Sequence, residues 1–265
     1  MITVGELFAG IGGIGLGLEM TGGFEVKWQV ERDEYASKVL AKHWPDVVRW
    51  DDVVTFPPPD TEWSVDVITA GFPCTDISVA NKEGKGLKGE RSGLFYEVVR
   101  IAERLKPKYI LLENVAALLT RGLGEVLREL AEIGFNAEWH CIPAAAVGAP
   151  HKRDRIFIIG YSNGHCELPQ RIAAEQVSRQ STLSRQLSRI RQHAGRQQWA
   201  TESRVARTSY GVRKRVDRTR CLGNAVLPQV AMVLGERILE WERCNETKEP
   251  GAKDSSRRNS RNCLG

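Results

Sequence analysis

Short runs of β-branched and aromatic residues alternate with stretches of helical periodicity along the first 160 residues. The strand-like runs are ITVGELFAG, FEVKWQVE, VDVITAGF, KYILLENV and RIFIIGY. Between them, IGLGLEM, YASKVLAKHW, LFYEVVRIAERL and GEVLRELAEIG place apolar residues at helical spacing. This alternation predicts an α/β, Rossmann-like fold with a mostly parallel sheet and helices on both faces. Ligands of such sheets bind at the carboxyl ends of the strands.

The pattern changes after Tyr161 and becomes globular again near the C-terminus. The intervening stretch is rich in Arg, Gln and Ser and poor in large apolar residues, so it forms no sizeable core by itself. From Cys221 onward, CLGNAVLPQVAMVLGERILEWE contains an amphipathic helix that can dock onto the first domain. We therefore expect a main domain over 1–160, an Arg-rich insert over 161–220, a returning segment over 221–244 and a polar, disordered tail over 245–265.

Positive charge is segregated along the chain. The net charge is +5, but positions 165–220 hold 13 basic and four acidic side chains. The N-terminus lacks the features of a signal peptide, and no apolar stretch approaches the roughly 20 residues of a membrane span, so we expect a soluble, cytoplasmic protein. The six cysteines include no CxxC pair, which argues against a disulfide framework and against a zinc ribbon.

A glycine-rich turn follows the first predicted strand. Gly10, Gly12 and Gly15 satisfy GxGxxG, which permits close approach of a nucleotide-like ligand. Alone this signal is weak, because a structural turn or an NAD site fits it as well. Glu31 ends the next strand about 20 residues later, where an acid can accept hydrogen bonds from a ribose diol. Asp52 is a further carboxylate in the following turn, where capping a helix is an equally good interpretation.

Cys74 comes directly after the strand-like run VDVITAGF. Pro73 stiffens this turn and keeps Phe72 extended, so the thiol is predicted to be exposed and fixed. The alternative, a buried inert thiol, is the usual state of a cysteine. The following strand ends in Glu113 and Asn114, at the same carboxyl edge of the sheet. A nucleophile and an acid are therefore expected in one cleft.

Five motifs occur together in a characteristic order: LFAGIGG, GFPC, ENV, HKRDR and GNAV. On these motifs, the chain resembles the cytosine-5 DNA methyltransferases over about residues 2–160 and 221–241. The resemblance implies that the Cys74 thiolate attacks C6 of cytosine and that Glu113 supplies a hydrogen bond or proton at N3. Glu113 should then have a raised pKa. Arg155 is expected to contact the flipped cytosine and Arg153 its phosphate, whereas solvated surface charge is the alternative for both.

The resemblance also implies S-adenosylmethionine as methyl donor and no metal. Glu31 is expected at its ribose and Asp52 near its adenine amino group. The remaining pocket residues are expected to be Phe8, Ala9, Gly10, Gly12 and Gly13 around the methionine part, with Pro73 and Asn224. Two positions depart from the family pattern: Arg32 stands where Trp is frequent, and Thr75 where Gln is frequent. The first weakens the expected stacking on adenine, and the second loosens a contact to phosphate or base.

Double-stranded DNA is the partner that the resemblance implies. Residues 161–220 lie where the family carries its target-recognition region, and their arginines suit contacts to phosphate and guanine. A disordered basic linker is the alternative. A cognate restriction endonuclease is an optional further partner, and a monomer is expected. Three rival functions remain at this stage: a tRNA cytosine-5 methyltransferase, a binding protein that keeps the fold without catalysis, and an NAD-dependent oxidoreductase, for which no hydride-transfer site is found.

Overall fold

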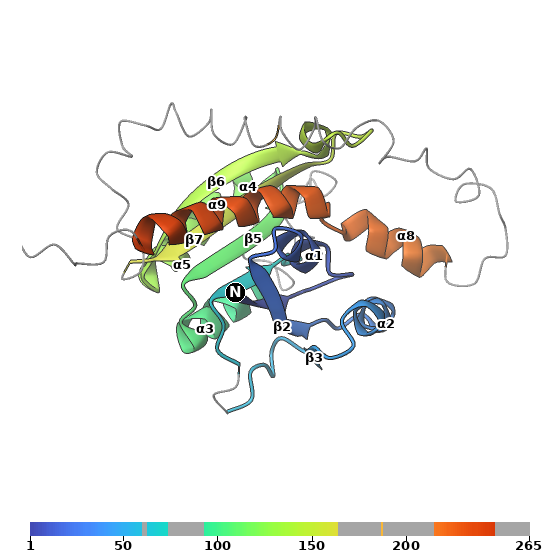
Figure 1. The fold of residues 1–265 in the computed structure, drawn as a ribbon, viewed down its shortest axis with the longest axis horizontal. Coiled ribbons are helices and arrows are strands. Elements are labelled where there is room, and N and C mark those ends of the chain that lie inside the picture. Colours follow the sequence, from blue (N-terminus) through green and yellow to red (C-terminus); the bar gives the residue numbers. More distant parts are fainter. Residues whose placement is uncertain (60–62, 74–92, 164–186, 188–214, 247–265) are drawn as a thin grey trace, which may run out of the picture.

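A seven-stranded sheet forms the centre of the molecule in the computed structural model (Figure 1). The structure describes residues 1–59, 63–73, 93–163, 187 and 215–246. The strand order is β3-β2-β1-β4-β5-β7-β6. The strands are β1 (Ile2–Leu7), β2 (Phe24–Val30), β3 (Val48–Trp50), β4 (Val67–Ala70), β5 (Tyr109–Val115), β6 (Phe135–Pro143) and β7 (Asp154–Ser162). β1 to β5 pair in parallel, and β7 runs antiparallel to β5 and β6. This confirms the predicted α/β fold with a mostly parallel sheet.

Helices cover both faces of this sheet. They are α1 (Gly13–Glu19), α2 (Glu34–His43), α3 (Leu94–Leu105), α4 (Leu118–Arg121), α5 (Leu123–Glu132), the 3₁₀ helix η2 (Ala144–Val147), α8 (Arg215–Asn224) and α9 (Pro228–Glu246). β5 shows how the sheet divides the core: Ile110 and Leu112 face the side covered by α3 and α5, while Tyr109 and Leu111 face α1 and α9. Alternating side chains of one buried strand thus serve two separate cores.

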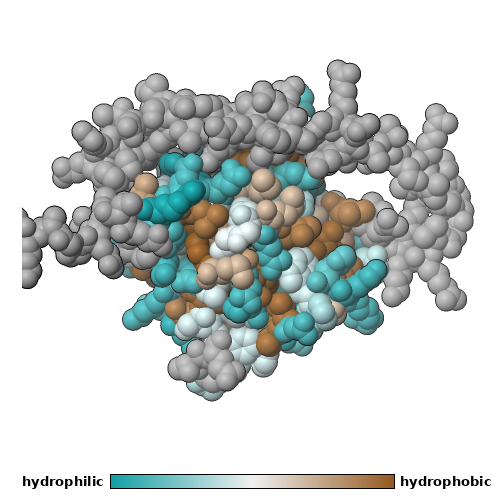
Figure 2. Space-filling view, viewed as in Figure 1, coloured by the Kyte–Doolittle hydropathy of each residue, from teal (hydrophilic) through white to brown (hydrophobic). Residues whose placement is uncertain are grey.

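The C-terminal helix α9 completes one of these cores. Val230, Val233, Leu234 and Ile238 are buried with Leu18 of α1 on one face of the sheet. On the side of the molecule seen in Figure 2, hydrophilic residues lie among hydrophobic ones over these elements. In the structure, α9 thus packs against the main sheet together with α1. The limits expected for the insert, the returning segment and the tail remain predictions, and α8 runs across the expected boundary at residue 221.

Candidate active site

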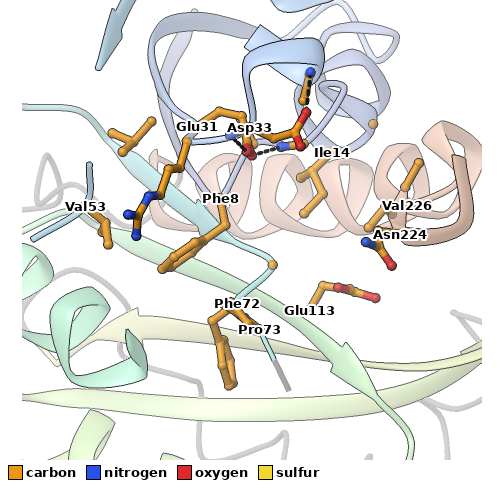
Figure 3. A pocket seen from close by; sticks show the side chains of 18 of the residues that line it. Phe8, Ile14, Glu31, Asp33, Val53, Phe72, Pro73, Glu113, Asn224 and Val226 are labelled. Carbon is orange, nitrogen blue, oxygen red and sulfur yellow. Dashed lines mark hydrogen bonds between the residues drawn. The ribbon is translucent and has the colours of Figure 1, made fainter. Parts of the chain in front are cut away.

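A cavity of about 930 Å³ lies at the carboxyl ends of β1 to β5 (Figure 3). The loops after β1 to β4, the carboxyl end of β5 itself, the start of β7 and the end of α8 contribute to its wall. The residues predicted from the sequence that line it are Phe8, Ala9, Gly10, Gly13, Glu31, Asp52, Pro73, Glu113, Arg155 and Asn224. The fold therefore gathers most of the predicted site in one place, and the volume is in the range of small-molecule sites.

The turn after β1 has a left-handed backbone at alternating positions. Phe8 has φ 54°, Gly10 has φ 57° and Gly12 has φ 81°. Such a conformation is uncommon for an aromatic residue, and outliers of this kind concentrate at functional sites. A Cβ on Gly10 would meet no atom within 4 Å. The backbone at Gly10 therefore faces open space, where a ligand can approach it.

Two other glycines of this motif serve packing inside the protein. A Cβ on Gly12 would lie 2.4 Å from the Trp44 ring, and one on Gly15 would lie 2.7 Å from the Glu6 carboxylate. Gly12 does not line the cavity, although the sequence grouped it with the cofactor residues. Two glycines of the GxGxxG pattern, Gly12 and Gly15, are therefore required by close packing inside the protein. Of the three glycines, only Gly10 lines the cavity.

Glu31 ends β2 and holds the glycine turn. One carboxylate oxygen accepts the Gly10 amide at 2.7 Å, and the other accepts the Asp33 amide at 2.7 Å. Burial raises the pKa of Glu31, against the lowering effect of these hydrogen bonds. Each carboxylate oxygen has capacity for a further donor. The side chain can therefore fix the turn and accept ligand hydroxyls together.

Asp52 lies in the loop after β3 and stabilises its turn. Its Oδ1 accepts the amide of Val54 at 2.9 Å. Thr55 also donates to the Asp52 carbonyl, through its amide at 3.2 Å and its hydroxyl at 3.1 Å. The capping role expected as an alternative is thus present, in a turn and not at a helix. Asp52 lines the cavity as well, so the two interpretations are compatible.

Asn114 holds the turn that leads to the predicted nucleophile. Its Nδ2 donates to the carbonyl of Phe72 at 3.3 Å, and its Oδ1 accepts the amide of Val115 at 2.7 Å. Phe72 and Pro73 both line the cavity, whereas Cys74 lies outside the described residues. Asn114 is buried, so this link between β5 and the turn after β4 is shielded from water.

Glu113 and Arg155 form an ion pair at the wall of the cavity. Arg155 Nε lies 2.9 Å from Glu113 Oε1, and β5 and β7 bring the two together by antiparallel pairing. Only 8% of Glu113 is exposed, and this burial raises its pKa, against the lowering effects of Arg155 and Arg153. A carboxyl with a raised pKa stays a proton donor up to a higher pH than usual. The direction agrees with the sequence-based expectation.

Arg153 lies beside this pair but does not line the cavity. Its guanidinium donates to the carbonyls of Gly223 at 2.5 Å and Ala225 at 2.7 Å. It thereby ties the HKRDR motif to the GNAV motif, on either side of Asn224. A contact between Arg153 and a phosphate stays a prediction. In the structure, its evident function is to dock the returning segment at the cavity.

Comparison with known proteins identifies the family. Residues 2–216 match the model for C-5 cytosine-specific DNA methylases. The chain belongs to this family.

Two curated relatives match part of this chain and part of their own length. It is 36% identical to the Type II methyltransferase M.Bsp6I of Bacillus sp. (strain RFL6), over 62% of this chain and 53% of the relative. It is 41% identical to M.CviJI of Paramecium bursaria Chlorella virus IL3A, over 58% of this chain and 41% of the relative. The chain thus spans about half the length of these relatives.

Solved structures support the fold assignment of this family member. A mutant of Spodoptera frugiperda DNMT2 superimposes with a TM-score of 0.52 at 23% identity, over 64% of this chain and 51% of the other. Dnmt2 of S. pombe gives a TM-score of 0.52 at 20% identity, over 62% and 51%. At this level of identity the similarity concerns the fold alone.

The cavity is also lined by residues that the sequence did not indicate. Arg220 and Cys221 of α8 line it, and Arg220 forms an ion pair with Asp33, the residue that caps α2. The sequence around Arg220 contains many arginines, so no motif distinguished Arg220 from the others. Within the described ranges no cluster of three or more metal-ligating side chains occurs, and none of their helices could cross a membrane.

Proposed function

We propose that the chain is a DNA cytosine-5 methyltransferase that uses S-adenosylmethionine and forms a covalent bond between Cys74 and C6 of the target cytosine. One observation carries this proposal. Glu113, paired with Arg155, shares a cavity with Glu31 and with Pro73, the residue before Cys74. A C-5 methylase needs these groups together, because the base and the methyl donor must meet at one point.

The cavity fits S-adenosylmethionine in its chemistry. Glu31 offers carboxylate oxygens to a ribose diol, the open backbone at Gly10 allows close approach, and Val53 adds apolar surface for a base. Asp52 and Asn224 supply polar groups at other parts of the wall. When bound, S-adenosylmethionine supplies a methyl group on a positively charged sulfur. The residues named here would hold and orient it.

The chemistry at the base follows from Cys74 and Glu113. The Cys74 thiolate forms a bond to C6, and negative charge then develops towards N3 of the ring. Glu113 donates a proton to N3, because burial favours its protonated form. C5, now the nucleophilic carbon of an enamine, would take the methyl group, and the sulfur of the donor would keep the electron pair of the broken S–CH3 bond, which leaves S-adenosylhomocysteine. A base then removes the C5 proton, the C5–H electron pair forms the C5–C6 double bond as the thiolate leaves, and N3 returns its proton to Glu113, which restores the aromatic ring.

Double-stranded DNA is the substrate that we propose. A cytosine must leave the duplex to reach the cavity, at a cost of a few kcal/mol. We assign the grip on phosphates and the reading of sequence to residues 161–220, of which nearly all lie outside the described part. The curated relatives are Type II methyltransferases, so a restriction endonuclease is a proposed separate partner. The chain is proposed to act as a monomer.

Covalent trapping tests this function. Duplex DNA that contains 5-fluorocytosine should become linked to the wild type in the presence of S-adenosylmethionine, because fluorine cannot leave as a proton. The Cys74→Ser variant should form no adduct and should still bind the cofactor. Absence of an adduct with the wild type would contradict the mechanism. Methylation of tRNA but never of duplex DNA would overturn the choice of substrate.

A further inference from the structure

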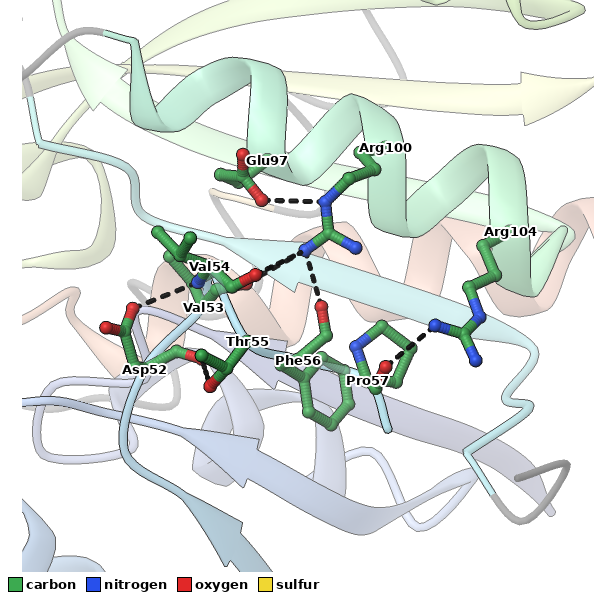
Figure 4. Close-up of polar contacts among 9 residues, drawn as sticks. All are labelled: Asp52, Val53, Val54, Thr55, Phe56, Pro57, Glu97, Arg100 and Arg104. Atoms are coloured by element: carbon green, nitrogen blue, oxygen red, sulfur yellow. Dashed lines mark hydrogen bonds and ion pairs between the residues drawn. The ribbon is translucent and has the colours of Figure 1, made fainter. Parts of the chain in front are cut away.

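Arg100 of α3 binds the main chain of the loop after β3 from outside the cavity (Figure 4). Its Nη2 lies 2.5 Å from the Phe56 carbonyl oxygen, 3.1 Å from that of Val53 and 3.4 Å from that of Val54. Its Nε pairs with Glu97 Oε2 at 2.7 Å. The guanidinium is thus oriented by one acid and directed at three carbonyl groups. Arg100 itself does not line the cavity.

The loop held by Arg100 forms one end of the cavity. Asp52, Val53 and Val54 all line it. The carbonyls of Val53 and Val54 accept hydrogen bonds from Arg100, which is not among the residues that line the cavity. Thr55 is fixed in addition, because Trp50 Nε1 donates to its hydroxyl at 2.9 Å. The position of the cavity wall at Val53 therefore depends on hydrogen bonds from Arg100, a residue outside the cavity lining.

The strand order determines which part of a ligand this loop meets. β3 is the edge strand, three places from β4, which leads to Pro73, and four from β5, which ends at Glu113. Figure 3 shows Val53 and Glu113 on opposite sides of the view, with Phe8 between them. The reacting methyl group must lie near Glu113 and Pro73. The opposite end of S-adenosylmethionine, its adenine, would then lie at Val53.

We propose that Arg100 is a positioning residue for S-adenosylmethionine, acting through the Val53 and Val54 main chain to place the wall against adenine. The inference rests on the proposed function, because it takes the ligand from there. Arg100 touches neither base nor cofactor. Its contribution should therefore appear as cofactor affinity and not as chemistry on bound substrate.

Arg104 provides a matched control on the same helix. It lies four residues later, on the same face of α3, and its guanidinium donates to the carbonyls of Pro57 at 2.7 Å and Pro58 at 2.9 Å. Neither proline lines the cavity. Arg104 thus makes the same kind of contact to the same chain segment, without a connection to the ligand. Loss of general stability should be similar for both arginines.

The test compares Arg100→Met with Arg104→Met, since methionine keeps an apolar stem and removes the donors. Calorimetry with S-adenosylhomocysteine should show a dissociation constant raised roughly tenfold for Arg100→Met and less than about threefold for Arg104→Met. Affinity for duplex DNA without cofactor should not differ between the two. A kinetic comparison should show a raised KM for S-adenosylmethionine with kcat nearly unchanged.

Several outcomes would overturn the inference. In the first, the wild type binds S-adenosylhomocysteine while both variants lose affinity equally. This result would contradict the role of Arg100 and leave the proposed function intact. If the wild type does not bind S-adenosylhomocysteine, both the role of Arg100 and the proposed function are contradicted. If Arg100→Met does not fold, Arg100→Lys replaces it, because an ammonium group cannot match the planar guanidinium. An intermediate loss of affinity is then expected, and unchanged affinity would contradict the inference.

Discussion

Glu6 is a buried acid beneath the glycine turn. Its carboxylate accepts the Gly15 amide at 2.7 Å and the Gln29 side-chain amide at 2.8 Å. Burial nevertheless raises the pKa of Glu6 to about 7. Folding therefore favours the protonated form of Glu6. The Gln29 side chain that donates to Glu6 also has a buried oxygen, Oε1, without a hydrogen-bond partner in the described part.

Glu6→Gln should change how stability depends on pH. The pKa of Glu6 is higher in the folded state than its usual value of 4.5, so its favourable contribution is present below that value and is lost as pH rises through about 7. The variant should lose less stability over this window and be more stable than the wild type at higher pH. Urea unfolding at several pH values measures this. Glu25→Gln, at a half-buried position of β2 where the side chain pairs with Lys27, should keep the wild-type profile.

Glu113→Gln should slow methylation without preventing cofactor binding. The amide keeps the shape of the side chain but has no acidic proton to give to N3, so kcat should fall on the order of 10²-fold or more. In the wild type, the raised pKa of Glu113 keeps the proton donor available to higher pH, and activity should decline above that pKa. Initial rates across pH with a saturating cofactor check both points. A variant with wild-type kcat would contradict the role of Glu113.

At the scale of elements, α1 and α9 approach each other through glycine. A Cβ on Gly17 would lie 2.2 Å from the Pro228 carbonyl oxygen and 2.6 Å from the Ala231 Cβ. Gly17→Ala should therefore destabilise the protein by about 1 to 3 kcal/mol, although alanine normally favours a helix. Gly124→Ala in α5, where a Cβ would meet no atom within 4 Å, should be neutral or stabilising. Equal effects in urea unfolding would show that the helices do not pack this closely.

The elements differ in how far the sequence predicts them. β4, β5 and β7 have runs of Val, Ile and Leu, and their buried positions read directly as strands. β6 has the sequence FNAEWHCIP, in which charged and polar residues interrupt the apolar ones, and we did not predict it. It is a strand because nine residues pair with β7. Tertiary pairing thus overrides a weak local preference.

The site shows the same division. Motifs identified Glu31, Glu113 and Arg155, because their side chains carry the chemistry. The sequence did not indicate Arg100. Its partners are main-chain carbonyls, which every residue has, so no sequence motif marks the contact. The packing role of Gly12 depends on Trp44, more than 30 residues away in sequence, and no local pattern shows that contact.

At the scale of the whole molecule, the returning segment supplies the helix α9, which covers one face of the sheet. Val230, Val233, Leu234 and Ile238 of α9 close the core over the face that α1 shares. A chain that ends after residue 226 should therefore lose cooperative unfolding and should aggregate, because this apolar surface is uncovered. Deletion of the polar residues 247–265 should leave the unfolding midpoint nearly unchanged. Circular dichroism on heating distinguishes the two truncations.

The aromatic cluster under the loop after β3 gives the protein an intrinsic optical signal. Phe56 lies 4.7 Å from the Trp28 ring and 5.0 Å from the Trp63 ring, and Trp50 lies 6.3 Å from Trp63. Three of the seven tryptophans thus surround one short stretch of chain. Indole emission depends on its surroundings, so an adenine settling against Val53 should alter the fluorescence. Binding can then be followed without a label, and Trp50→Phe should remove the part of the signal that arises nearest Thr55.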